Sequence, residues 1–150
     1  MNAHPEILLV EDNPYDADLV IRALRKRNLA EKVTRANDGQ EALDFFFGAG
    51  STDASGSIKV VFLDLKMPKV GGLEVLQKLK SDNRTRCLPV VMLTSSQENC
   101  DVQECYRLGA NSYIVKPMKF EDFAQIIGDL GTYWVERNHL PDKSSRNFQS

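Results

Sequence analysis

The sequence has few of the residues that build disulfide frameworks and zinc sites. Its 150 residues include three cysteines, Cys87, Cys100 and Cys105, and no two of them form a CxxC pair. The two histidines lie near opposite ends of the chain and have no companion at ligand spacing. This pattern argues against a disulfide scaffold, a CxxC redox centre and a structural zinc site. We expect free thiols in a reducing compartment.

Long apolar runs and an excess of basic charge are also missing. No apolar run approaches the roughly 20 residues that cross a bilayer, and residues 1–6 lack the apolar stretch of a signal peptide. The formal net charge of −2 gives no basic field that would draw the chain onto nucleic acid phosphates. We therefore expect a soluble, cytoplasmic protein whose partners are neither nucleic acid nor membrane.

The composition that is present favours one globular domain. Hydrophobic residues make up 42% of the chain and charged residues 27%, which is the balance of a folded domain and not of a disordered segment. A chain of this length can bury a core without disulfides or structural metal. We predict a single domain over residues 1–140 and a disordered tail over residues 141–150, where the sequence is polar.

Short apolar runs alternate with amphipathic stretches, the pattern of β-α units in an α/β fold with a parallel sheet. Asn13 and Pro14 form a good helix start after the first run, and Ser95 with Glu98 has the spacing of a capping box before the fourth helix. The predicted strands are Ile7 to Val10, Lys32 to Ala36, Val60 to Leu63, Val90 to Leu93 and Ser112 to Val115.

Polar or charged residues follow four of the predicted strands. The carboxyl ends of parallel strands border the crevice where ligands bind, so residues far apart in sequence should meet there. Isolated Asp, Thr and Lys residues are common at strand ends, and an acidic pair before a helix can simply favour the helix dipole. Coincidence at four ends is harder to explain in that way. The residues are Glu11 and Asp12, Asp64, Thr94 and Ser95, and Lys116 with Pro117.

Three carboxylates gathered at one edge would repel one another unless a cation is present. Mg²⁺ suits such a cluster because it binds a few carboxylates together with water and often phosphate oxygens. A carboxylate beside the metal can attack a phosphoryl group. Lys116 and Thr94 then offer a charge and a hydroxyl for the oxygens of the transferred group.

The sequence resembles the receiver domains of two-component response regulators. The resemblance runs from about Glu6 to Leu130 and is carried by LLVEDN, VVFLDLKMPKVGG, VVMLTSS and YIVKP in this order. Each segment alone is weak evidence for this family, but the four segments in this order are specific to it. The resemblance implies a doubly wound, flavodoxin-like (βα)5 fold, with five parallel strands in the order 2-1-3-4-5.

The resemblance also implies a role for each matching residue. Asp64 is similar to the phosphoacceptor, Asp12 to the direct metal ligand and Glu11 to its partner through water. The backbone carbonyl of Lys66 would complete the protein's share of the metal shell. Thr94 is similar to the switch hydroxyl that binds the phosphoryl group, and Lys116 to the lysine that pairs with that group. Tyr113 is similar to the switch aromatic. The resemblance also implies a cis Lys116–Pro117 bond.

A narrower resemblance is to stand-alone receivers associated with bacterial and cyanobacterial phytochromes. It rests on EDNPYDADLV, EALDFF and TYWVERNHLP. It implies a sensor histidine kinase as phosphodonor, a light-sensing phytochrome among the candidates, although no residue here reports light. We expect a homodimer through the fourth helix, fifth strand and fifth helix, because without an output domain the signal must pass through a surface.

Three other classes of protein share part of this pattern. A haloacid-dehalogenase-type phosphatase needs a second Asp two residues after the nucleophile, where this chain has Lys66. A flavodoxin-like electron carrier needs a phosphate-cradling loop, and the acidic pair after the first strand would repel that phosphate. The alternative is a pseudo-receiver that only binds partners, and the joint presence of Asp12, Asp64, Thr94 and Lys116 disfavours it. We expect no enzyme activity beyond the protein's own phosphorylation and dephosphorylation.

Overall fold

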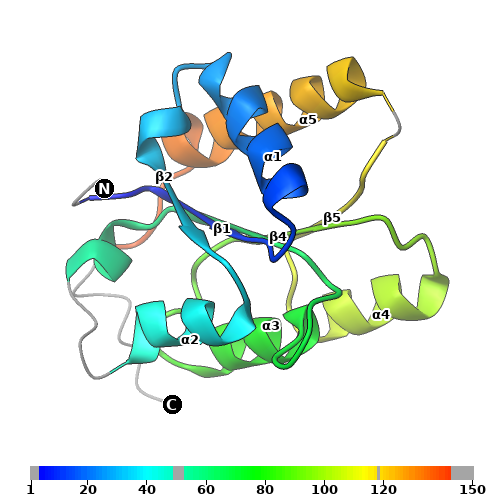
Figure 1. Cartoon of the computed structure of the whole chain (residues 1–150). Helices are drawn as coiled ribbons and strands as arrows, with labels where there is room; N and C mark the ends of the chain where they lie inside the picture. The colour runs from blue at the N-terminus through cyan, green and yellow to red at the C-terminus, as the bar shows by residue number, and fades with distance from the viewer. Residues whose placement is uncertain (1–3, 49–52, 118, 143–150) are drawn as a thin grey trace.

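The computed structural model describes residues 4–48, 53–117 and 119–142. The predicted disordered tail falls mostly outside this part of the chain. The described helices and strands alternate as the sequence indicated (Figure 1). They are β1 Ile7–Val10, α1 Pro14–Arg25, β2 Val33–Ala36, α2 Gly39–Phe47, β3 Val60–Leu63, α3 Gly72–Ser81, β4 Val90–Thr94, α4 Asn99–Arg107, β5 Ser112–Val115 and α5 Phe120–Thr132. Short 3-10 turns cover Ala30–Lys32 and Asp53–Ser57, and a π-helical turn, Tyr133–Arg137, extends α5.

The five strands form one parallel sheet in the order β2-β1-β3-β4-β5. This is the predicted doubly wound, flavodoxin-like order, so the fold prediction is confirmed. The strands β1, β3 and β4 are fully buried, as expected for strands covered on both faces. The edge strand β2 is half-buried, which agrees with its alternating polarity.

Helices cover both faces of the sheet and create two hydrophobic layers. In Figure 1, α1 and α5 lie on one face and α2, α3 and α4 on the other. Successive residues of a strand point to opposite faces, so β1 contributes Ile7 and Leu9 to the α1–α5 layer and Leu8 and Val10 to the layer under α2, α3 and α4. The sheet therefore separates two cores that share their strands.

The start of α1 is formed as predicted. The Asn13 side chain accepts hydrogen bonds from the backbone N–H groups of Tyr15 and Asp16, and Pro14 occupies the first helical position. This cap fixes the chain direction directly after the acidic pair that follows β1.

The predicted capping box at α4 is wrong. Glu98 is the N-cap residue and makes no side-chain cap bond. Ser96 takes over the local bonding, because its hydroxyl accepts from the Glu98 N–H and donates to Asp101. The β4–α4 loop is thus held by Ser96, one residue later than the pattern suggested.

Candidate functional site

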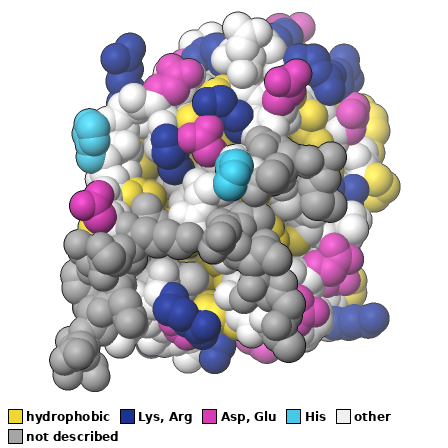
Figure 2. All heavy atoms as spheres, turned by 90° about the vertical axis from the view of Figure 1, so that its left-hand side faces the viewer, with side chains coloured by type: hydrophobic (Ala, Val, Ile, Leu, Met, Phe, Trp, Pro, Cys, Tyr) yellow, Lys and Arg dark blue, Asp and Glu magenta, His cyan; other side chains and the backbone are white. Residues whose placement is uncertain are grey.

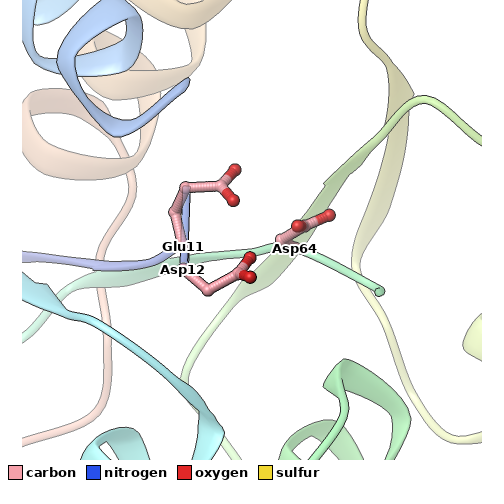
Figure 3. Close-up of side chains that lie close together, drawn as sticks. All are labelled: Glu11, Asp12 and Asp64. Atoms are coloured by element: carbon pink, nitrogen blue, oxygen red, sulfur yellow. The ribbon is translucent and has the colours of Figure 1, made fainter. Parts of the chain in front are cut away.

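Strand register brings the acidic residues together. Val10 pairs with Leu63 across β1 and β3, so the residues that follow them, Glu11 and Asp64, emerge side by side. The Asp64 N–H donates to the Val10 carbonyl at 3.0 Å and extends this ladder. Glu11, Asp12 and Asp64 each place one carboxylate oxygen within 4.8 Å of the others (Figure 3).

The electrostatics of this cluster favour binding of a cation. Burial raises the pKa of Glu11 to about 7; the Asp64 charge adds to this, and Lys116 opposes it. Burial also raises the pKa of Asp64, although the Lys116 charge and hydrogen bonds work against the shift. Two crowded carboxyl groups of this kind are stabilised by a proton or by a metal ion.

The donor set fits a hard divalent ion such as Mg²⁺. Three carboxylates converge from two neighbouring strand ends, and carboxylate oxygens are the protein ligands that Mg²⁺ takes most often. The backbone of Lys66 lies beside the cluster, because its N–H is a hydrogen-bond donor to the Asp64 carboxylate. The role of the Lys66 carbonyl as a metal ligand stays a prediction.

Lys116 reaches this cluster from β5. Its Nζ lies 3.0 Å from Glu11 Oε1 and 3.3 Å from Asp16 Oδ2. Burial lowers the pKa of Lys116, but the surrounding carboxylates outweigh this effect and raise it above its ordinary value. The site therefore contains a charged ammonium group that hydrogen-bonds two carboxylates, neither of which is Asp64.

The expected cis bond before Pro117 is wrong for this structure. The described residues contain no cis peptide bond, so Lys116 and Pro117 are joined in trans. The trans form is favoured by about 0.5–1 kcal/mol even for bonds to proline. The Lys116 side chain contacts the acidic cluster although the Lys116–Pro117 peptide bond is trans.

Thr94 and Tyr113 are linked through Ser96. Thr94 is buried, with 2% of its surface exposed, and its hydroxyl accepts a hydrogen bond from the Ser96 N–H at 3.3 Å. The Tyr113 hydroxyl donates to the Ser96 carbonyl at 2.9 Å. The two residues predicted as the switch pair thus contact one short backbone segment, and a displacement of this segment would move both.

Sequence reasoning missed two residues beside the cluster. Arg35 donates from Nε and Nη2 to the Glu11 carbonyl at 3.1 and 2.9 Å. Asp16 holds Lys116, as described above. A cation one residue before the end of an edge strand was a usable signal for Arg35. Asp16 gave no distinct signal, because an acid in the first turn of a helix usually serves the helix dipole.

The sequence matches the family described as the response regulator receiver domain over residues 7–128. The chain belongs to this family, and it is a receiver-domain response regulator of two-component signalling. None of the described helices is long and apolar enough to cross a membrane.

Among curated proteins, the chain is similar to the probable methanogenesis regulatory protein FilR2 of Methanothrix harundinacea. The two are 38% identical over 138 residues, which cover 90% of this chain and 86% of the relative. It is also 33% identical to the response regulator Rcp1 of Synechocystis over 135 residues, 90% of this chain and 92% of Rcp1.

Two solved structures show the same fold. One is the phosphorylated cyanobacterial phytochrome response regulator RcpA, with a TM-score of 0.81 and 33% identity over 93% of this chain and all of RcpA. The other is the Mn²⁺-bound form of Rcp1, with a TM-score of 0.80 and 30% identity over 91% of this chain and 99% of Rcp1. The resemblance to phytochrome response regulators is therefore confirmed at the level of homology.

Proposed function

We propose that Asp64 accepts a phosphoryl group from the phosphohistidine of a sensor histidine kinase, in a reaction that requires Mg²⁺. The observation that carries this proposal is the Glu11, Asp12 and Asp64 cluster, in which one buried and two half-buried carboxyl groups converge without enough positive charge. Bound Mg²⁺ would supply positive charge to the phosphoryl oxygens. The phosphorylated form of RcpA and the Mn²⁺-bound form of Rcp1 support this chemistry for the present chain, which is similar to both.

The protein's own groups would share the transfer. An Asp64 carboxylate oxygen attacks phosphorus while the P–N bond to the histidine breaks, and the imidazole leaves. Glu11 and Asp12 hold the metal. Lys116 and the Thr94 hydroxyl provide a cation and a donor for the phosphoryl oxygens.

The response to phosphorylation would pass through Ser96. When the Thr94 hydroxyl turns towards the phosphoryl group, it gives up its hydrogen bond with the Ser96 N–H. The Tyr113 hydroxyl is bonded to the carbonyl of the same residue, so its ring would follow. Phosphorylation then shifts the population between two arrangements of the surface around α4 and β5.

The partners follow from this mechanism. A cytoplasmic histidine kinase, with a phytochrome as a candidate, would donate the phosphoryl group, as the similarity to Rcp1 and RcpA supports. Output would use a homodimer through α4, β5 and α5, near which Tyr106 and Tyr133 are each 50% exposed. The protein would act on no substrate beyond its own Asp64 phosphate.

Treatment with acetyl phosphate tests the proposal. Intact mass spectrometry should show one added phosphoryl group in the presence of Mg²⁺ and none with EDTA. Asp64→Asn should abolish the addition, because the amide is a poor nucleophile, and Asp18→Asn on the exposed face of α1 should not. Labelling that persists in Asp64→Asn would place the chemistry elsewhere, and no labelling of the wild type would favour a pseudo-receiver.

A further inference from the structure

Lys116 is held by two carboxylates, while the charge of Asp64 also acts on its ammonium. Its ammonium is bonded to Glu11 and to Asp16, at 3.0 and 3.3 Å. Its side chain, 19% exposed, lines a hollow between α1 and α5 together with Asp16, Leu19 and Phe120. The Asp16 contact therefore holds the ammonium from α1, whereas Asp64 follows β3.

Asp16 is well suited to hold a cation. It is the third residue of α1, where its backbone N–H donates to the Asn13 cap at 3.1 Å. A carboxylate in the first turn of a helix is stabilised by the helix dipole. Its side chain is 37% exposed, far more than the 3% of the Glu11 side chain.

Asp16 is also outside the candidate metal cluster. That cluster consists of Glu11, Asp12 and Asp64, which lie on the β1 and β3 ends. A cation bound there would engage Glu11, one of the two partners of Lys116, and leave Asp16 unengaged. Asp16 would then be the remaining anion that competes with a phosphoryl group for the lysine.

We propose that Asp16 is a positioning residue that holds Lys116 at rest and competes with the Asp64-bound phosphoryl group for its ammonium. This inference rests on the proposed function. Partly exposed ion pairs of this kind change equilibria modestly, so loss of the Asp16 charge should strengthen capture of a phosphoryl mimic by roughly two- to fivefold.

The test is a beryllofluoride titration with saturating Mg²⁺, followed by amide NMR, on three proteins. Asp16→Asn should bind beryllofluoride roughly two- to fivefold more tightly than the wild type. Asp18→Asn removes the same charge from an exposed position on the same helix, and its affinity should match the wild type. Asp16→Glu, which restores the carboxylate, should return the affinity towards the wild-type value.

A second readout reports the contact without any ligand. The Cε–Hε resonances of Lys116 should shift in Asp16→Asn and stay in place in Asp18→Asn. Equal affinities for the wild type and Asp16→Asn, weaker binding by Asp16→Asn, or an equal gain in Asp18→Asn would overturn the inference while leaving the proposed function intact. If the wild type binds no beryllofluoride at all, both fail.

Discussion

Glu6 and Glu11 flank the same strand, β1, and their carboxyl groups behave in opposite ways. Glu6 lies between Lys32 and Lys59, at 2.8 and 2.7 Å. Burial tends to raise the pKa of Glu6, but hydrogen bonds and charge from the two lysines outweigh it and lower the pKa below its ordinary value. At the other end of the strand, burial and Asp64 raise the pKa of Glu11 to about 7.

The difference comes from what the neighbouring strands supply at each edge. Lys32 and Lys59 directly precede the region of β2 and β3 that pairs with β1, so the amino edge is neutralised. Figure 2 looks onto this side and shows acidic and basic side chains next to one another. At the carboxyl edge β3 supplies a second carboxylate instead. The carboxylate at the amino edge is thus neutralised by lysines, whereas the carboxylates at the carboxyl edge need a cation. The carboxyl edge is also where ligands bind in such sheets.

The largest effect expected from this comparison is stabilisation by Mg²⁺. At 100 times its dissociation constant, the ion should raise the free energy of unfolding by about 2.7 kcal/mol over the EDTA-treated protein. Asp12→Asn should lose most of this gain, whereas Glu6→Gln should keep it. Urea denaturation followed by circular dichroism measures each value. A gain that survives in Asp12→Asn would place the metal outside the cluster.

Arg35→Gln should have the next largest effect. It removes the paired hydrogen bonds to the Glu11 carbonyl, and bonds from charged groups contribute about 1.5–3 kcal/mol. Partial exposure reduces this, so we expect a loss of about 1 kcal/mol in stability and weaker Mg²⁺ binding. Arg35→Lys should recover only part, because one ammonium cannot copy the fork of a guanidinium. Calorimetry with Mg²⁺ compares the variants, and unchanged affinity would contradict the role.

The pH dependence of the metal-free protein should reveal Glu11. Its folded pKa is raised, so the folded state binds the extra proton between about pH 4.5 and 7, and stability is lost as the pH rises through this window. Glu11→Gln should remove this slope and be more stable than the wild type at about pH 8, by on the order of 1 kcal/mol. Titrating groups that do not interact with Glu11 cancel in the difference. Identical slopes for both proteins would show that Glu11 ionises normally.

Glu6→Gln should have the smallest effect on stability, and the sign of this effect is opposite to that of Glu11→Gln. Because the folded pKa of Glu6 is lowered, its contribution is present above about pH 4.5 and is lost as the pH falls through the folded pKa. Two partly exposed ion pairs suggest a destabilisation of about 0.5–1 kcal/mol at neutral pH. Molar salt should shrink the difference. A destabilisation that persists at pH 3 would show that packing, and not charge, is responsible.

The strands and the acidic edge could be predicted because they depend on local pattern and one topological rule. β1, β3 and β5 have the predicted bounds, and β4 extends one residue further, to Thr94. Parallel packing then requires that their carboxyl ends meet. The first step uses information that lies within a few residues of each site residue, and the second is a general rule for parallel sheets.

The contacts that escaped prediction depend on side chains that meet across long stretches of sequence. The Lys116 bonds to Glu11 and Asp16 span about 100 residues, and their choice depends on the rotamer of a long, flexible side chain. Arg35 reaches Glu11 only because β2 is placed beside β1. At α4, the spacing of Ser95 and Glu98 fits a capping box, but the helix begins only at Asn99 and Glu98 itself is the N-cap residue.

The sheet that separates the two hydrophobic layers also has a consequence for redesign of the protein. Ile7 and Leu9 face α1 and α5, whereas Leu8 and Val10 face the other helices. Distant substitutions without shared partners combine almost additively, so the outer helices on one face can be repacked without retuning the other. The surface of α1 and α5 could therefore be altered separately from that of α4, with the sheet between them left unchanged.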